Sequence, residues 1–274
     1  IADRLKKISR KVAITPWGSD VLRAKKYQLR GLRKLVQKSN WVTCTQGSRF
    51  EKDIVTLLDI PKEKLYNLPI GIASIDEILS RPFITDEQAK RVWGFEGKYV
   101  IVIGYNGSPA HNHIKVIKSL VFMKKQLPTN TILVCPMTYG GNPVYRKKIK
   151  RLLWNSQFEN QILENYLTAE ELVCLRKATD LFIHAQNTDA NSGTIAEYLL
   201  CRKKIVNPTW ITYPHYETYG SPFYSFSNFE ELPQAIMKAI NDTSNKVSPL
   251  LTGNISESGW SKLACKWVEL YKKY

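Results

Sequence analysis

Short, continuously apolar runs alternate along the chain with segments whose apolar residues recur at helical spacing. An apolar run of about four to eight residues is typical of a strand buried on both faces, and i, i+3, i+7 spacing is typical of a helix packed on one face. The pattern predicts strands at 11–15, 41–45, 99–103, 131–137, 161–165, 180–185 and 204–208. It predicts helices at 21–38, 48–58, 113–125, 143–154, 168–177, 194–202, 229–241 and 260–272. Strands alternating with helices indicate an α/β fold with parallel sheets covered on both faces.

Three polar turns follow predicted strands, at 16–20 (PWGSD), 104–113 (GYNGSPAHNH) and 187–193 (NTDANSG). Ligands of parallel α/β sheets bind outside the carboxyl ends of the strands, so we expect these turns to carry the chemistry.

The turn at 187–193 opens a predicted helix at Ser192, Gly193 and Thr194. The first N–H groups of a helix lack intrahelical partners and lie at its positive end, so this position favours a phosphate. Two carboxylates, Asp189 and Glu197, stand eight residues apart across the turn. They indicate one pocket whose ligand combines a phosphate with hydroxyl groups. The alternative is a simple helix cap by Asp189 or Ser192, with Glu197 in solvent.

Charge changes this picture, because the net charge is +16 and residues 1–38 hold twelve Lys/Arg against two acids. Such a basic face attracts anionic lipid, phosphorylated substrates or nucleic acid, or is only a solvated lysine-rich surface. There is no recognised nucleic-acid-binding motif, no apolar run of membrane-spanning length and no apolar core of a secretory leader. Five scattered cysteines without a CxxC pair favour free thiols and a cytoplasmic location.

Only two predicted strands precede the proline-containing stretch 72–96, where the alternation of strands and helices lapses. Two strands are too few for a doubly wound domain, so we expect the chain to lack an amino-terminal portion. The expected divisions are 1–72 as the remainder of a first Rossmann-like domain, 73–258 as a second domain, and 259–274 as a helix packing back toward the first.

The stretch ATDLFIHAQNT, followed by Asp189 and Glu197 at this spacing, resembles the carboxyl-terminal domain of GT-B glycosyltransferases, especially family 4. TPWGSDVL, WVTCTQGSRFEKDI and KLYNLPIGI resemble that family's segments in the same order. The resemblance implies two Rossmann-like domains. It also implies Glu197 on the donor ribose, Asp189 near the donor sugar and the diphosphate in the turn between them. Trp17 departs from the family, whose members often carry a histidine there.

GYNGSPAHNHIKVIKSL and CPMTYGGNPVYRKKI are more similar to the bacterial lipid-II-dependent 4-acetamido-4,6-dideoxygalactose transferases. The family's usual Arg and Lys for the diphosphate are missing from the first of these turns. The resemblance therefore implies neutral diphosphate donors, namely Asn106, Gly107, Ser108, His111 and His113. The alternative is a helix-cap region that touches no ligand.

The resemblance as a whole implies a GT-B glycosyltransferase that moves a sugar from a nucleoside-diphosphate sugar to a glycan or lipid-linked acceptor, with no metal and no cofactor. Residues 1–38 would rest peripherally on anionic membrane, with no nucleic-acid partner. If the reaction inverts configuration, Asp20 is the candidate base in the front part of the chain. The aromatic loop 209–226 either stacks on sugar or base or is a packed surface loop. Alternatives are a non-catalytic nucleotide-sugar-binding partner of a glycosyltransferase and a basic nucleic-acid-binding protein.

Overall fold

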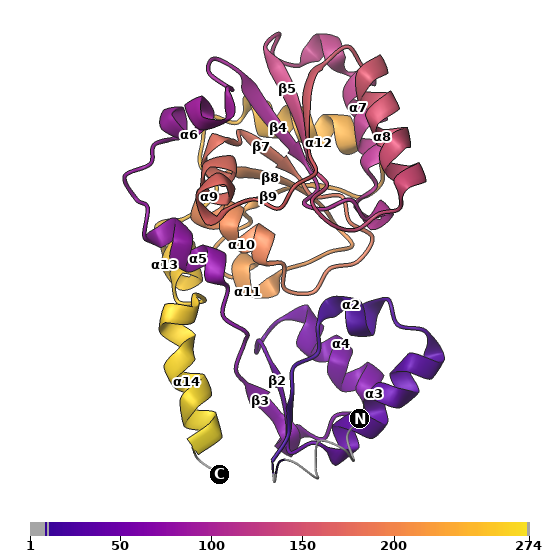
Figure 1. The fold of residues 1–274 in the computed structure, drawn as a ribbon, viewed down its shortest axis with the longest axis vertical. Helices are drawn as coiled ribbons and strands as arrows, with labels where there is room; N and C mark the ends of the chain where they lie inside the picture. Colours follow the sequence, from indigo (N-terminus) through magenta and orange to yellow (C-terminus); the bar gives the residue numbers. More distant parts are fainter. Residues whose placement is uncertain (1–8, 10, 273–274) are drawn as a thin grey trace.

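The computed structural model describes residues 9 and 11–272, which form two α/β parts, each built on a parallel sheet (Figure 1). The first sheet has the order β1-β2-β3, with β1 at Ala13–Ile14, β2 at Trp41–Cys44 and β3 at Leu65–Asn67. The second has the order β6-β5-β4-β7-β8-β9. Its strands are β4 (Tyr99–Ile103), β5 (Thr131–Pro136), β6 (Glu159–Leu163), β7 (Leu181–Ile183), β8 (Lys204–Pro208) and β9 (Phe223–Phe226). The predicted α/β fold with parallel sheets is confirmed.

Helices α2 (Gly18–Leu22), α3 (Lys26–Lys38) and α4 (Arg49–Leu58) belong to the first part. The prediction of one helix over 21–38 is wrong, because helix α2 ends at Leu22 and a separate helix, α3, begins at Lys26. Lys25 is extended, and its N–H donates to Oε1 of Gln28 at 2.7 Å, which caps the new helix.

The second sheet is covered on both faces, as its apolar strands require. One layer contains α5 (Ala73–Leu79), α6 (Asp86–Trp93), α9 (Ala169–Ala178), α10 (Gly193–Leu200) and α13 (Pro249–Ser256). The other contains α7 (His113–Phe122), α8 (Pro143–Asn155) and α12 (Leu232–Asn241). Strand β4 shows the division, because Val100 and Val102 face the first layer and Ile101 and Ile103 the second.

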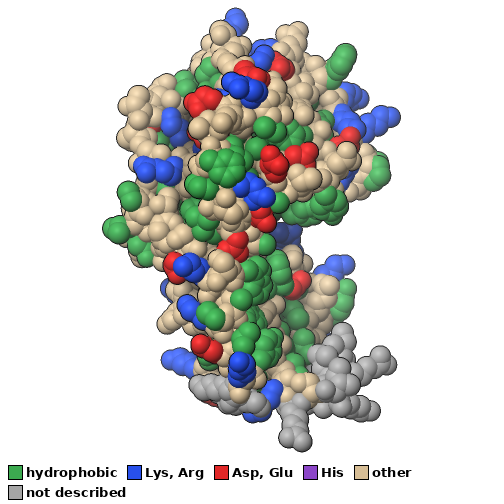
Figure 2. Space-filling model, turned by 60° about the vertical axis from the view of Figure 1, so that its left-hand side comes forward, with side chains coloured by type: hydrophobic (Ala, Val, Ile, Leu, Met, Phe, Trp, Pro, Cys, Tyr) green, Lys and Arg blue, Asp and Glu red, His purple; other side chains and the backbone are tan. Residues whose placement is uncertain are grey.

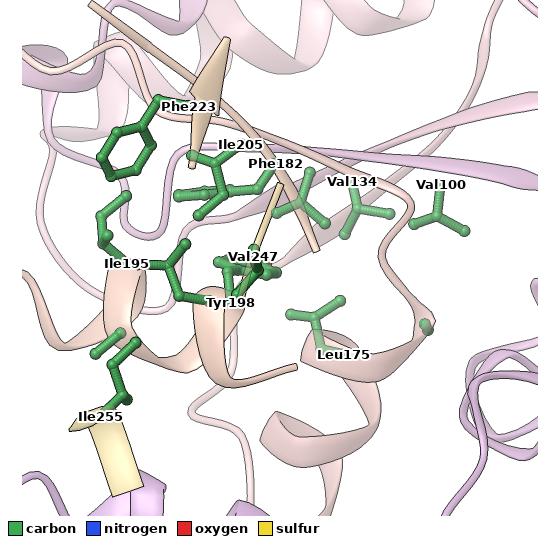
Figure 3. Close-up of a cluster of buried hydrophobic side chains, with 14 of the residues drawn as sticks. Val100, Val134, Leu175, Phe182, Ile195, Tyr198, Ile205, Phe223, Val247 and Ile255 are labelled. Carbon is green, nitrogen blue, oxygen red and sulfur yellow. The ribbon is translucent and has the colours of Figure 1, made fainter. Parts of the chain in front are cut away.

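Helix α10 is anchored in the first layer by apolar side chains (Figure 3). Its Tyr198 stacks on Phe182 of β7 with ring centroids 4.2 Å apart, and Ile195 lies in the same buried cluster. These contacts hold the amino end of α10 at the carboxyl edge of the sheet.

The order of the second sheet reverses at β4, which pairs with β5 on one side and with β7 on the other. Such a reversal separates the turns after two neighbouring strands and opens a crevice there. The turns after β4 and β7 are the polar turns at 104–113 and 187–193, so the topology places both beside the crevice.

Strands β3 and β9 and helices α5, α6, α13 and α11 (Pro214–Glu217) are not among the predicted elements. Strand β9 and helix α11 both lie inside the aromatic loop 209–226. Strand β9 is an edge strand of four residues, and its aromatic-rich sequence resembles the loop before it. The predicted final helix is confirmed as α14 (Trp260–Lys272).

The chain passes between the two parts along residues 68–72, beside α14 (Figure 1). Nε1 of Trp267 donates to the carbonyl oxygen of Pro69 at 3.1 Å, and Trp260 lies so close to Gly71 that a Cβ there would meet its ring at 2.5 Å. Figure 2 shows the resulting shape, a broad part joined to a narrower one. In the described residues, no helix combines the length and apolarity needed to cross a membrane.

Candidate functional site

A cavity of about 690 Å³ lies between the two parts. The first part contributes the carboxyl ends of its strands, at 15–18, 43–46 and 67–72. The second contributes 190, 191 and 193 from the turn after β7, 215, 216 and 219 from the aromatic loop, and residues of 254–266. The volume is that of a site for a small organic ligand.

The amino end of α10 opens on this cavity. Ser192 is the N-cap, and its Oγ accepts the N–H of Ile195 at 3.4 Å. Gly193 lines the cavity, and Thr194 follows it in the first turn. The first-turn N–H groups and the helix dipole make this end suited to an anion.

Two polar atoms beside the cavity are buried without a hydrogen-bond partner, Oδ1 of Asn191 and Nδ1 of His215. Burial lowers the pKa of His215 to about 4, so its ring is neutral near pH 7. A buried polar atom without a partner costs free energy, so both atoms are ready to bind a hydroxyl-rich ligand. Neither residue was predicted; the signal for His215 was its place in the aromatic loop.

Asp189 does not project freely into the cavity. Its Oδ1 accepts the N–H of Ala190 at 2.8 Å, and its Oδ2 lies 2.8 Å from the hydroxyl of Tyr213 and 3.1 Å from Nε2 of His184. Burial alone raises the pKa of Asp189, but these bonds outweigh it and hold the pKa below the ordinary value. Nδ1 of His184 lies 2.8 Å from Oδ1 of Asn207. These hydrogen bonds of Asp189 and His184 hold the turn at 187–193 in place from its buried side.

Glu197 is buried rather than solvated. Its Oε2 accepts from Nε of Arg176 at 2.6 Å, and its Oε1 accepts from Oγ of Ser74. Nη1 of Arg176 also donates to the hydroxyl of Tyr198 at 3.1 Å. Side chains of Arg176 and Glu197 are both 7% exposed, so the pair is a desolvated ion pair. The alternative in which Glu197 stands in solvent is wrong.

The predicted residues of the turn after β4 face the neighbouring turn after β5. The N–H of Gly107 donates to the carbonyl oxygen of Tyr139 at 2.7 Å, and Oδ1 of Asn106 accepts the N–H of Ser108 at 2.8 Å. A Cβ on Gly141 would meet the carbonyl oxygen of Gly107 at 2.1 Å, so glycine is required for the two turns to touch. Asn106, Gly107 and Ser108 do not line the cavity.

His111 and His113 are fully buried. Nε2 of His111 lies 3.3 Å from Nε2 of Gln186, and Nδ1 of His113 lies 3.1 Å from the hydroxyl of Tyr145. Burial lowers the pKa of His111 to about 2 and that of His113 to about 4, so both rings are neutral near pH 7. Nδ1 of His111 and Nε2 of His113 are buried without a hydrogen-bond partner, but neither histidine lines the cavity.

Asp20 accepts the N–H of Trp17 at 3.1 Å and so caps α2. Trp17 is 61% exposed and lines the cavity with Gly18, whereas Asp20 does not. A Cβ on Gly18 would lie 2.6 Å from Cβ of Ala190, so the turn after β7 approaches the first part closely at this point.

The structure thus brings Gly193 to the cavity, with Ser192 and Thr194 beside it, and sets Asp189 and Glu197 just behind. It does not bring the turn after β4 or Asp20 to the cavity wall. Sequence reasoning missed His184 and Arg176, the buried partners of the two carboxylates. The only signal was indirect: a carboxylate on an apolar helix requires a basic partner somewhere.

No family model and no curated protein matches the sequence. Solved structures do, over nearly the whole chain. Anabaena HepE, in complex with UDP and glucose, is similar with a TM-score of 0.77 and 15% identity, over 100% of this chain and 74% of HepE. A glycosyltransferase from Rickettsia africae is similar with a TM-score of 0.72 and 16% identity, over 98% of this chain and 72% of its own. WaaG, a glycosyltransferase involved in lipopolysaccharide biosynthesis, is similar with a TM-score of 0.66 and 14% identity, over 98% of this chain and 80% of its own. The chain therefore has the GT-B fold.

Proposed function

We propose that the protein is a glycosyltransferase that takes a sugar from a nucleoside-diphosphate donor. The observation that carries the proposal is the amino end of α10 opening on a cavity between the two parts of a GT-B fold. HepE, which shares this fold, has been crystallised with UDP and glucose, so a uridine nucleotide is the first donor to test.

In this proposal the diphosphate lies against the first-turn N–H groups of α10, at Ser192, Gly193 and Thr194. Fixed N–H dipoles stabilise the charge that grows on the departing phosphate, which is usually the largest contribution in such sites. The turn at Asn106–Ser108, with His111 and His113 beneath it, is assigned to the far side of the diphosphate as a prediction. No metal is assigned a role.

Glu197 is assigned to the ribose. The hydrogen bonds of Glu197 support this role. Arg176 orients Oε2 of the carboxylate, and a ribose hydroxyl can replace Ser74 as the donor to Oε1. Asp189 remains the candidate near the donor sugar, and its bonds to His184 and Tyr213 make it a positioning residue for the turn.

Asn191 and His215 are assigned to hydroxyl groups of the donor sugar or of the acceptor, because their unpartnered atoms lie beside the cavity. Asp20 as catalytic base for an inverting reaction stays a prediction. The acceptor is a glycan or a lipid-linked sugar in cell-surface polysaccharide synthesis. Residues 1–38 would then rest on the inner face of an anionic membrane; of these, residues 1–8 and 10 lie outside the described residues.

The site can be tested by removing one N–H group without disturbing the helix. Gly193 is the first helical residue, where proline is well tolerated, and Ser192 before it is already extended, as a residue before proline requires. Gly193→Pro removes the N–H, and Gly193→Ala keeps it as the matched control, since its Cβ would make only an ordinary contact with Ile72 at 3.5 Å. Calorimetry with UDP, GDP and dTDP should show one nucleotide bound by the wild type and by Gly193→Ala. Binding by Gly193→Pro should be about ten-fold to a hundred-fold weaker.

Equal affinity in the two variants would show that α10 does not hold the diphosphate. Release of nucleotide from the matching nucleotide sugar, measured on the wild type, separates an enzyme from a non-catalytic binding partner. Nucleotide binding without turnover in the presence of lipid-linked and glycan acceptors favours the binding partner. Salt-sensitive binding of duplex DNA or RNA, with no effect of nucleotides, favours the nucleic-acid-binding alternative.

A further inference from the structure

Residues 97–158 contain ten Lys/Arg and no Asp or Glu. This stretch builds β4, β5 and the helices α7 and α8. Residues 1–38 and 97–158 each have a net charge of +10, so the rest of the chain has a net charge of −4. This second basic stretch is separate in sequence from residues 1–38, and three of its cations, Lys98, Arg146 and Lys150, are paired with Glu159 or Glu164.

The outer face of α8 concentrates this charge. Lys147, Lys148 and Arg151 are exposed, and no carboxylate of the described residues lies within 4 Å of them. Lys150 differs, because its Nζ is 2.7 Å from a carboxylate oxygen of Glu164. The exposed side of α8 thus offers three uncompensated cations within little more than one helical turn.

Apolar side chains stand exposed among these cations. Trp154 and Phe122 are each 83% exposed, and Val144 is 78% exposed. Val144, Lys147, Lys148, Lys150, Arg151 and Trp154 lie together on the outer face of α8. Phe122 ends α7, which packs beside α8, and exposed Lys118 and Lys125 flank it.

A large exposed tryptophan surrounded by cations fits one kind of partner, an anionic lipid surface. The indole has an apolar ring and a polar N–H, and tryptophan is enriched where water meets lipid. Lys and Arg beside it gain from the negative surface potential of anionic leaflets. The face shown in Figure 2 is different, since acidic and basic side chains are interspersed there. Figure 1 draws α3, which contains the basic residues of 26–38, on the same side as α8.

We propose that the α7–α8 face, defined by Phe122, Lys147, Lys148, Arg151 and Trp154, is a docking surface for an anionic lipid bilayer. None of these residues lines the cavity between the two parts. Docking on this face therefore does not depend on the proposed glycosyltransferase chemistry.

The test is co-sedimentation of the full chain with vesicles of phosphatidylcholine containing roughly one third phosphatidylserine, a strongly anionic composition. Each basic residue at such a surface strengthens binding by about five-fold, so Lys147→Ala/Lys148→Ala/Arg151→Ala should weaken it on the order of a hundred-fold. Trp154→Ala should weaken it about ten-fold. The matched controls are Lys52→Ala/Lys62→Ala/Lys272→Ala and Phe83→Ala, which remove exposed side chains elsewhere and should change binding less than about two-fold.

Unchanged thermal unfolding and unchanged nucleotide binding of each variant show that folding and the donor site are intact. The proposal is overturned if the triple variant sediments with anionic vesicles as well as the wild type does. It is also overturned if the wild type ignores these vesicles but binds duplex RNA through the same three residues, since the partner is then nucleic acid.

Discussion

Replacing Arg176 tests the buried pair behind α10. Arg176→Met removes the guanidinium and leaves the carboxylate of Glu197 with Ser74 as its remaining partner in a buried site. Glu197→Ala leaves the guanidinium of Arg176 with only the hydroxyl of Tyr198. Either change therefore strands a charge that is 7% exposed.

The magnitude follows from this burial. Removing one member of a buried ion pair costs about 3–5 kcal/mol, because the other charge has lost its compensation. With 274 residues, this loss lowers the midpoint of thermal unfolding by about 10 °C. Arg176→Met/Glu197→Met removes both charges and should be more stable than either single variant, since apolar side chains of similar volume often replace such a pair at little cost.

The assay is urea unfolding followed by circular dichroism, with nucleotide affinity measured separately by calorimetry under native conditions. The two measurements distinguish the roles of Glu197. If it holds ribose, Glu197→Ala weakens nucleotide binding well beyond the effect of Arg176→Met, although both lose similar stability. A loss of less than about 1 kcal/mol in both single variants, or additive losses in the double variant, would refute the reasoning from a buried pair.

Three further outcomes follow from the site and its surroundings. Burial lowers the pKa of His111 to about 2 and the pKa of His113 and His215 to about 4, so only the unfolded chain takes up these protons as the pH falls below about 6.5. Each histidine should therefore lower the free energy of unfolding by up to about 3 kcal/mol between pH 6.5 and pH 4 in urea titrations, and a flat profile contradicts this. Gly18→Ala sets a Cβ 2.6 Å from that of Ala190 and should cost about 1–3 kcal/mol in unfolding free energy. Gly253→Ala, inside α13, meets nothing within 4 Å and should instead stabilise the fold by about 0.5–1 kcal/mol. His215→Phe keeps an aromatic ring but removes the unpartnered nitrogen, so the KM for sugar donor or acceptor should rise about ten-fold. The Kd for the free nucleotide should stay unchanged, and a changed nucleotide Kd would place His215 at the nucleotide instead.

Much of the second part could be predicted from the sequence, because its signals are local. The apolar, β-branched run 99–103 predicts a buried strand from its own residues, and Ser192 and Gly193 indicate the start of α10. The interruption between α2 and α3 near Lys25 could not be predicted, because the residues on both sides are similarly good helix formers. The start of α3 is marked only by the hydrogen bond from the N–H of Lys25 to Oε1 of Gln28.

The surroundings of the carboxylates could not be predicted, because they depend on tertiary contacts. Arg176 lies on α9, and the sequence contains many other basic residues that could have paired with Glu197. The cavity needs both sheets at once, so its unpartnered atoms at Asn191 and His215 had no sequence signal as a pair.

The crossover at 68–72 has a consequence for spectroscopy. The indoles of Trp260 and Trp267 both rest on this short stretch of backbone, one over Gly71 and the other bonded to Pro69. A rotation of either α/β part against the other must bend the backbone at the point where both indoles touch it. Emission from Trp260 and Trp267, isolated by replacing the other five tryptophans with phenylalanine, therefore reports opening of the cavity during nucleotide titration without an added label.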